Sequence, residues 1–335
     1  MNREARARSF LAGTDWRGAE LRPLAGDASN RRYFRLTSAA GHPAILMDSP
    51  PERGEDVRPF LDVAGHLAGL GLSAPAILDA DAATGFLLLE DLGDALFARV
   101  VRADPALEAP LYDAATDVLA RLQEAPPMPG LAAYDAETMA PLAGLAARWY
   151  VRAPEARPAL EAACRTALAA TETGRPVVAL RDYHAENLLW LPQRRGLARV
   201  GLLDFQDARL GQPSYDLASL IRDARRDVSA PVAQAARGRF ARLSGLDTDT
   251  LTAQLAAQGA QRNLRILGVF ARLSLHFGKP HYVDLIPRVW DHLTADLAHP
   301  GLSTLRETVE AVLPPPSARH LSDLKARCGT VPTLA

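Results

Sequence analysis

Two polar stretches decide the fold of this chain: LRDYHAENLLW at residues 180–190 and VGLLDFQDARLGQPSYDLASL at residues 200–220. The first stretch holds Asp182 and, five residues later, Asn187, whereas the second places Asp204 at the end of an apolar run. Short apolar segments that are typical of buried strands flank both stretches. The sequence therefore predicts two carboxylates and an amide on two loops that are held by strands.

These three side chains have the chemistry that phosphoryl transfer from ATP requires. Such a transfer needs a carboxylate that orients the acceptor hydroxyl and metal ions that neutralise phosphate charge. Mg²⁺ prefers oxygen ligands, and the Asp-x-x-x-x-Asn spacing matches the catalytic loop of kinases. We therefore predict that Asp182 accepts the proton of the acceptor and that Asn187 and Asp204 hold Mg²⁺. Each residue taken singly is also explained as a turn or helix-cap residue.

Composition restricts the class of protein and its partners. The chain has 335 residues, 48% hydrophobic and 23% charged, which suits one large globular domain or two lobes. A net charge of −1 indicates neither a nucleic acid nor an anionic membrane as a partner, and no apolar run reaches the length of a membrane span. The first sixteen residues lack the apolar core of a signal peptide and predict a surface helix, with a transit peptide as the alternative. Two isolated cysteines, Cys164 and Cys328, fit a reducing cytoplasm.

The pattern of apolar residues changes near Gly93, which divides the chain into two parts. Before Gly93, short runs separated by Gly, Asn and Pro predict antiparallel strands, with one helix over residues 54–71. After Gly93, helical patterns cover most of the chain, at 94–125, 136–152, 154–173 and 214–313. We predict an α+β fold with a β-rich nucleotide-binding lobe over residues 1–92 and a helical catalytic and substrate-binding lobe over residues 93–335.

The first part also holds two candidate nucleotide-binding segments. The first is a turn of small residues that comprises Gly26, Asp27, Ala28, Ser29 and Asn30, and Arg32 lies in the strand that follows. Such a turn lets backbone N–H groups and a basic side chain approach phosphates. The segment LLLEDLGD at residues 87–94 predicts a hinge, where the backbone near Glu90 and Leu92 would bind an adenine edge. An ordinary hairpin turn and strand end explain the same residues.

A lysine that kinases place on the third strand is missing from this sequence. Met47 occupies about that position, and no lysine precedes Lys279. Because arginine also binds phosphate, an arginine near the second strand is a candidate substitute, paired with an acid of the predicted helix at 54–71. The candidates are Arg31, Arg32 and Arg35 for the base, with Glu55 and Asp62 for the acid.

The two opening stretches resemble the aminoglycoside phosphotransferase and choline kinase superfamily. The matching residues are Asp182, His184, Asn187, Asp204, Gly211, Pro213 and the run Asp216–Leu217–Ala218. The resemblance implies a protein-kinase-like, two-lobed fold, in which Asp216 braces the catalytic loop and His184 is a hydrogen-bonded loop residue. The chain departs from the superfamily at Leu180 and Arg181, where His and Gly are usual, so the loop must be held in another way and Arg181 pairs with a phosphate or an acidic neighbour.

A wider set of motifs resembles a narrower group, the bacterial anomeric kinases for N-acetylmuramate and N-acetylglucosamine. In chain order these motifs are LAGDASNRRYFRL, MDSPPE, LLLEDLGD, RWY, LRDYHAENLLWL, GLLDFQDA, QRNLRILGVFARL and GKPHYVDLIPRVW, covering most of residues 20–295. The resemblance implies that ATP and Mg²⁺ serve to phosphorylate the anomeric hydroxyl of the amino sugar. The product, a sugar 1-phosphate, would feed a nucleotide-sugar pool in cell-wall recycling.

The sugar site is the least constrained part of the sequence. Aromatic residues stack on pyranose rings, and amide or guanidinium groups bind hydroxyl and carboxylate groups, although core packing and solvated helix faces explain the same residues. The candidates are Trp149, Tyr150, Arg181, Asp207, Gln261, Arg262, Asn263, Arg265 and Arg272.

Two other functions fit the same motifs. A kinase of the superfamily that acts on an aminoglycoside, choline or homoserine would share the catalytic residues. A pseudokinase that binds nucleotide without transfer would account for the missing lysine, although it has no need of Asp182, Asn187 and Asp204 together.

Overall fold

The structure, a computed structural model, describes residues 2–24 and 30–332. Contacts group the chain into two compact units, each made of two segments. Unit 1 comprises residues 1–114 and 185–208, and unit 2 comprises residues 115–184 and 209–335. The boundary between residues 92 and 93, which was predicted from the change of sequence pattern near Gly93, stays a prediction.

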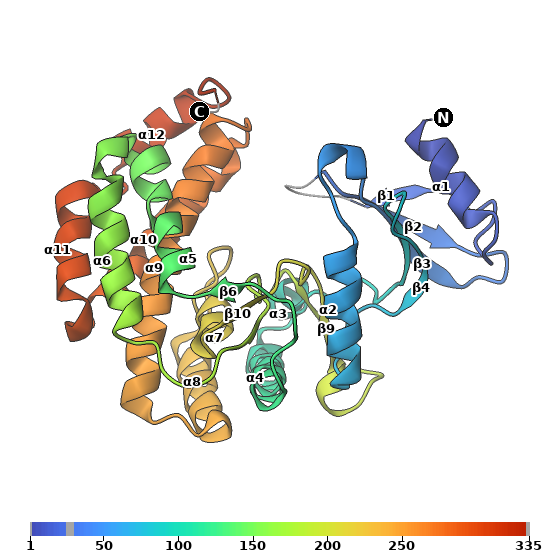
Figure 1. Cartoon of the computed structure of the whole chain (residues 1–335), viewed down its shortest axis with the longest axis horizontal. Coiled ribbons are helices and arrows are strands. Elements are labelled where there is room, and N and C mark those ends of the chain that lie inside the picture. The colour runs from blue at the N-terminus through green and yellow to red at the C-terminus, as the bar shows by residue number, and fades with distance from the viewer. Residues whose placement is uncertain (1, 25–29, 333–335) are drawn as a thin grey trace. The chain divides into compact units, whose positions relative to one another are not determined.

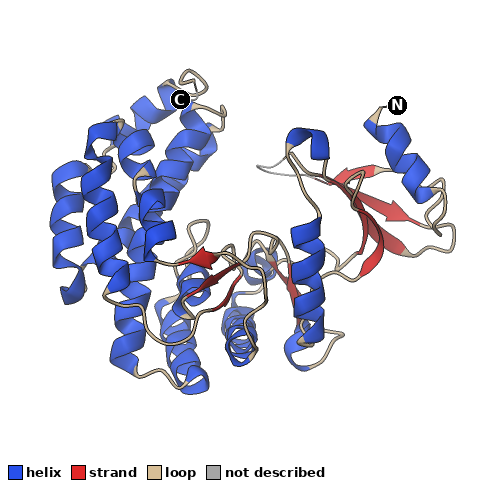
Figure 2. Ribbon diagram, viewed as in Figure 1, coloured by secondary structure: helices blue, strands red, loops and turns tan. Residues whose placement is uncertain are grey.

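Unit 1 contains a five-stranded antiparallel sheet, drawn in red in Figure 2. Its strands are β1 (Arg22–Leu24), β2 (Arg32–Thr37), β3 (Pro43–Asp48), β4 (Ile77–Asp81) and β5 (Phe86–Glu90), in the order β1-β2-β3-β5-β4. These strands confirm the antiparallel strands that were predicted before Gly93. Gly85 has a φ of +77°, and a Cβ there would lie 1.9 Å from the Ser49 carbonyl oxygen, so the turn before β5 requires glycine.

Helices complete the core of unit 1. They are α1 (Arg3–Leu11), α2 (Arg58–Gly69) and α3 (Phe97–Ala103), with short 3₁₀ turns at Pro51–Arg53 and Pro105–Leu107. Ala7 and Leu11 of α1 are buried against Leu36, Leu46 and Phe86 of the sheet. The N-terminal segment therefore forms the predicted helix, and two of its residues also contribute to the core.

Unit 2 is mostly helical and contains one small sheet. Its helices are α5 (Ala136–Ala143), the π-helical segment η3 (Ala146–Val151), α6 (Arg157–Ala169), α7 (Ser214–Ile221), α8 (Ala230–Ser244), α9 (Thr248–Leu275), α10 (Ile286–Leu297), α11 (Ser303–Val312) and α12 (Ala318–Ala326). Helix α4 (Glu108–Glu124) contributes residues to both units. The small sheet has the order β6-β10-β7, from β6 (Ala133–Tyr134), β7 (Val177–Ala179) and β10 (Arg209–Gly211).

The 28-residue helix α9 organises unit 2. Asp247 caps its N-terminus by accepting a hydrogen bond from the Thr250 amide at 2.8 Å. Most residues of α9 are buried, and the helix packs against α5, α7, α10 and η3 (Figure 1). The predicted α+β fold, with a β-rich N-terminal part and a larger helical part, is confirmed. Within the described part of the chain, no helix is long and apolar enough to cross a membrane.

Candidate active site

A two-stranded hairpin in unit 1 positions Asn187 and Asp204. Strand β8 (Leu188–Trp190) pairs antiparallel with β9 (Val200–Leu202), and Leu188 lies opposite Leu202. Asn187 directly precedes β8, and its carbonyl oxygen accepts a hydrogen bond from the Leu203 amide at 3.0 Å. The hairpin therefore brings the predicted amide and carboxylate to the same end, although they are seventeen positions apart in the sequence.

The backbone at Asp204 is unusual. Its φ of 57° lies in the left-handed region, which costs a non-glycine residue roughly 1 kcal/mol or more. The next residue, Phe205, is fully buried and packs on Phe60 of α2 with ring centroids 4.8 Å apart. The Gln206 amide donates to Asp204 Oδ1 at 2.8 Å, and Asp207 accepts from the same amide at 3.4 Å. Buried neighbours on the chain thus hold the exposed Asp204 carboxylate in place.

Asp182 lies in unit 2, on a loop that Asp216 of α7 braces. The Asp216 carboxylate is buried and accepts hydrogen bonds from the Leu180 amide at 2.6 Å and the Arg181 amide at 2.9 Å. Arg181 has a φ of 72°, so the chain turns sharply just before Asp182. Because both hydrogen bonds go to backbone groups, they do not depend on the side chain at position 180, and the buried Leu180 is accommodated where the superfamily has His.

Charges around Asp182 keep its carboxylate ionised. Burial disfavours the charged form, but Arg262, Arg265, His184 and Arg181 outweigh that effect and lower the pKa of Asp182. The opposite balance holds at Asp216, where burial dominates and raises the pKa to about 7. An ionised Asp182 can accept a hydrogen bond from an acceptor hydroxyl at neutral pH.

His184 is a buried loop residue. Its Nε2 lies 3.2 Å from Arg225 Nη1, and because arginine only donates, Nε2 accepts and the proton is assigned to Nδ1. Burial and the Arg225 charge lower the pKa of His184 to about 4. The ring is therefore uncharged at neutral pH and a weak base, in agreement with the predicted role as a hydrogen-bonded loop residue.

The predicted phosphate-binding turn falls mostly outside the described residues, which exclude Gly26, Asp27, Ala28 and Ser29. Asn30, the last residue of that turn, donates from its side chain to the Arg53 carbonyl at 3.5 Å. At the predicted hinge, Glu90 forms an ion pair with Arg194 and accepts a hydrogen bond from the Ala76 amide at 3.2 Å, while Leu92 is half-buried. Their nucleotide-binding roles stay predictions.

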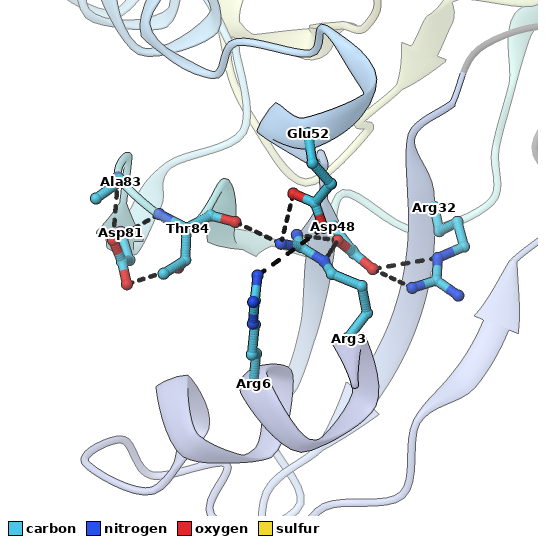
Figure 3. A network of polar contacts seen from close by, with 8 residues as sticks. All are labelled: Arg3, Arg6, Arg32, Asp48, Glu52, Asp81, Ala83 and Thr84. Carbon is cyan, nitrogen blue, oxygen red and sulfur yellow. Dashed lines mark hydrogen bonds and ion pairs between the residues drawn. The ribbon is translucent and has the colours of Figure 1, made fainter. Parts of the chain in front are cut away.

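The three candidate arginines have different partners. Arg32 pairs with the buried Asp48, which also accepts from Arg3 of α1 (Figure 3). Arg35 pairs with Asp91 at 2.6 Å and with Asp94 at 2.7 Å. Arg31 pairs with Glu55 at 2.9 Å, and both side chains are largely buried, with exposed fractions of 14% and 13%. The other candidate acid, Asp62, is exposed on α2.

Tyr33 shows which arginine shares the environment of Asp204. Tyr33 lies directly opposite Met47 in the β2–β3 ladder, so both side chains point to the same face of the sheet. Burial raises the pKa of the Tyr33 hydroxyl to about 12, and the charges that act on it are those of Arg31, Asp204 and Glu55. The Arg31–Glu55 pair thus lies on the face where the missing lysine would project.

The candidate sugar residues separate into core and site positions. Trp149 and Tyr150 are buried in the core of unit 2, where the Tyr150 hydroxyl donates to the Pro314 carbonyl at 2.9 Å. Gln261 is also buried and donates to the Met139 carbonyl at 2.7 Å. These placements favour the packing interpretation for all three residues, and their predicted contact with sugar gains no support.

Arg265 and Arg181 instead belong to the surroundings of Asp182. Arg265 donates to the Tyr215 hydroxyl at 3.4 Å, and the Arg181 guanidinium lies over the Tyr134 ring, 5.2 Å from its centroid. Tyr134 and Tyr215 contact each other edge to face with centroids 5.1 Å apart. Sequence reasoning missed this tyrosine pair, and its one local signal was the position of Tyr215 beside Asp216 in the QPSYD run.

Comparison with known proteins places these observations in a family. The model of a family described as the phosphotransferase enzyme family matches residues 20–252. A protein of Caulobacter vibrioides named N-acetylmuramate/N-acetylglucosamine kinase is 39% identical over 355 residues, covering 93% of this chain and 97% of that protein. A protein of the same name in Pseudomonas aeruginosa is 34% identical over 310 residues, covering 88% and 89%.

Solved structures agree on the fold. A choline kinase from Streptococcus pneumoniae superposes with a TM-score of 0.63 at 14% identity, covering 87% of this chain and 99% of that one. The GDP complex of aminoglycoside 2'-phosphotransferase-IIIa superposes with a TM-score of 0.60 at 15% identity, covering 89% and 99%. At these identities the likeness concerns the fold alone.

Proposed function

The chain belongs to the phosphotransferase enzyme family, and on this premise we propose that it transfers the terminal phosphoryl group of ATP to the anomeric hydroxyl of N-acetylmuramate and N-acetylglucosamine. The observation that carries the proposal is the 39% identity, over nearly the whole chain, to a protein named for kinase action on these two sugars. The product would be a sugar 1-phosphate. The proposed reaction belongs to recycling of the cell wall and takes place in the cytoplasm, where ATP is available.

In the proposed mechanism, Asp182 orients the acceptor. Its ionised carboxylate accepts a hydrogen bond from the anomeric hydroxyl and takes the proton as the oxygen attacks the terminal phosphorus of ATP, whose bond to the bridging oxygen breaks to release ADP. Arg262 and Arg265 keep this carboxylate ionised, and Asp216 holds the loop through two backbone amides. The loop thereby presents a fixed acceptor of hydrogen bonds, which is the geometric requirement of this chemistry.

Asn187 and Asp204 fit the requirements of Mg²⁺. A neutral amide oxygen and an exposed carboxylate at one end of the hairpin are the oxygen donors that this ion prefers, with water completing its shell. Bound Mg²⁺ would neutralise charge on the phosphates. We further propose that Arg31, oriented by Glu55, replaces the missing third-strand lysine as the phosphate-binding cation. The support for Arg31 is its largely buried ion pair and its shared environment with Asp204.

The charges near Asp182 bear on the alternatives. Three arginines, Arg262, Arg265 and Arg181, lower the pKa of Asp182, so a cationic aminoglycoside or choline would meet repulsion from them. The pseudokinase alternative is favoured by Met47 at the lysine position and opposed by the Arg31–Glu55 pair.

Phosphorus NMR tests the proposal directly. The protein is incubated with ATP, Mg²⁺ and either N-acetylmuramate or N-acetylglucosamine, with kanamycin and choline in parallel. A new resonance coupled to an anomeric proton supports the proposal. Product with kanamycin or choline alone would support a kinase of this family but contradict the proposed amino sugar acceptor. If ATP binds but stays intact with every acceptor, the pseudokinase alternative is supported instead.

The Asp182→Asn variant provides the control for this measurement. Asparagine keeps the size of the side chain but cannot accept a proton, so turnover should fall by roughly a hundredfold or more. ATP binding, measured by isothermal titration, should remain unchanged. Equal turnover in the variant and the wild type would contradict the assigned role of Asp182.

A further inference from the structure

Two arginines lie on one face of α9 where the helix contacts a neighbouring segment. Arg265 and Arg272 are seven residues apart, or about 10 Å along the helix axis. Between them, Gly268 allows so close an approach that a Cβ there would lie 2.3 Å from the Leu145 carbonyl carbon. This face of α9 therefore packs against η3, which carries Arg148.

Within the described part of the chain, Arg272 lacks the carboxylate that usually neutralises an arginine, whereas the charge of Arg265 is balanced in part by the nearby Asp182. Among the described residues, neither arginine forms an ion pair with a carboxylate, and Arg272 Nε is buried without a hydrogen-bond partner. Arg265 donates to the Tyr215 hydroxyl, and Arg272 lies over the Phe277 ring, 5.8 Å from its centroid. Burial, together with the charges of Arg148 and Arg265, lowers the pKa of Arg272.

Several other arginines of unit 2 do have carboxylate partners. Arg239 pairs with Asp117 at 2.6 Å, Arg165 with Glu137 at 2.9 Å and Arg288 with Asp227 at 2.6 Å. Holding like charges together in a partly buried place costs free energy unless an anion joins them. A face that keeps such a cluster is therefore suited to an anionic ligand.

The cluster is continuous with the candidate acceptor site. Arg265 is one of the charges that lower the pKa of Asp182, so it lies within electrostatic range of the catalytic carboxylate. Beyond the Asp182 carboxylate, the positive charges of Arg265 and then Arg272 follow along α9, and all three residues belong to unit 2. An acceptor whose hydroxyl meets Asp182 would direct a more distant group along α9.

We propose that Arg265 and Arg272 form an anion subsite, which binds the carboxylate of an acidic amino sugar while the anomeric hydroxyl of that sugar faces Asp182. This inference rests on the proposed function and makes it more specific. N-acetylmuramate carries a lactyl carboxylate, and N-acetylglucosamine lacks it, so the subsite discriminates between the two sugars. Arginine suits this role because its guanidinium binds a carboxylate through two parallel hydrogen bonds.

The test compares both sugars with the Arg272→Gln variant. Loss of a charged hydrogen-bonding partner should lower kcat/KM for N-acetylmuramate by about 10- to 100-fold, whereas kcat/KM for N-acetylglucosamine should stay within about twofold. For N-acetylmuramate, the kcat/KM of the Arg272→Lys variant should lie between those of the wild type and Arg272→Gln. For N-acetylglucosamine, Arg272→Lys should have no effect. The methyl ester of N-acetylmuramate lacks the free carboxylate, so it should be a poor substrate of the wild type. Its kcat/KM should not fall further in Arg272→Gln.

Controls separate the subsite from a structural effect. Arg165→Gln removes a partly exposed arginine that pairs with Glu137, and it should leave both sugars unaffected. Without ligand, Arg272→Gln should melt at or above the wild-type temperature, because it removes repulsion among like charges. The proposed subsite would be overturned if kcat/KM in Arg272→Gln fell equally for both sugars, or for neither of them.

A failure of the proposed function is distinguishable from a failure of the subsite. If the wild type phosphorylates neither sugar, isothermal titration with N-acetylmuramate and N-acetylglucosamine still measures the preference for the acid. Tighter binding of the acid by the wild type, and its loss in Arg272→Gln, would support the subsite without turnover. Identical affinities of the wild type for both sugars would reject it.

Discussion

Asp182 and Asp216 are carboxylates of the same unit with opposite shifts in pKa. At Asp182 the arginines outweigh burial, and at Asp216 burial outweighs two backbone hydrogen bonds. The difference corresponds to the proposed role of Asp182, which is to accept a hydrogen bond from a ligand, and to the hydrogen bonds by which Asp216 holds the loop. Two residues of one type, about thirty positions apart, are thus distinguished by their surroundings alone.

The raised pKa of Asp216 predicts a pH dependence of stability. Between pH 3.8, the ordinary value, and about 7, the unfolded chain has released this proton while the native chain retains it. The unfolded state therefore binds fewer protons, and the free energy of unfolding should fall as pH rises through this window. Asp216→Asn should reduce the slope by up to about 1.4 kcal/mol per pH unit.

Urea unfolding at several pH values measures this slope. Asp296, whose pKa burial also raises to about 7, leaves a residual slope of the same sign in the variant. Asp291→Asn, at an exposed position of α10, controls for the loss of a carboxylate. A slope that is identical in wild type and Asp216→Asn would show that Asp216 does not titrate in this range.

Arg31 gives a second prediction for a single residue. Arg31→Met should raise the KM for ATP by roughly tenfold or more, because a charged partner of phosphate is lost. Adding Met47→Lys to this variant should recover part of the loss, since Met47 lies on the same face of the sheet as Tyr33. Arg22→Met, which removes an exposed pair with Glu20, is the matched control. No change of KM in Arg31→Met would contradict the assignment.

At the scale of elements, the contact between α9 and η3 determines where Arg265 and Arg272 lie. Gly268 allows the α9 backbone to lie against Leu145, and no larger residue fits without movement of one of the two helices. Proline and glycine also divide the predicted helical stretches, as at Pro105, where Asp104 caps a new turn before α4. Close helix contact thus depends on a residue whose helix propensity is poor.

Gly268→Ala should destabilise the protein although alanine favours helices. A Cβ 2.3 Å from the Leu145 carbonyl carbon overpacks the contact, which should cost about 1–3 kcal/mol of unfolding free energy. Gly238→Ala in α8 is the matched control, because a Cβ there meets its nearest atom at 3.6 Å. The free energy of unfolding of the Gly238→Ala control should rise by about 0.5–1 kcal/mol. A stabilised Gly268→Ala variant would contradict the close contact.

At the scale of the whole molecule, unit 1 requires a segment that comes late in the chain. Phe60 packs on Phe205, the Ser73 hydroxyl donates to the Ala198 carbonyl at 2.7 Å, and Glu90 pairs with Arg194. The partners of these residues lie within 185–208, beyond the predicted lobe boundary. Without residues 185–208, the side chains of Phe60, Ser73 and Glu90 in unit 1 therefore lose these partners.

A fragment experiment tests this dependence. Residues 1–92 produced alone should unfold at lower urea concentration, or aggregate, compared with residues 1–114 joined by a flexible linker to residues 185–208. Circular dichroism during urea unfolding compares the two fragments. Equal midpoints would show that the segment 185–208 adds nothing to the stability of unit 1.

Sequence patterns alone were enough to predict the fold class and the strands of the sheet and to name the catalytic candidates. These features depend on local patterns: alternating apolar residues, helical periodicity, and a polar motif whose spacing is restricted by the chemistry of phosphate transfer. The brace from Asp216 and the role of His184 followed from the family resemblance, and contacts within unit 2 agree with both.

The folded chain was needed to show which candidates share an environment. It separated Arg31 from Arg32 and Arg35 by their partners, placed Trp149 and Tyr150 in the core, and added Tyr134 and Tyr215 near Asp182. The sequence contains no such information, because burial and charge pairing join residues that are distant along the chain. The pKa of a carboxylate and the choice of its arginine partners arise from these long-range contacts.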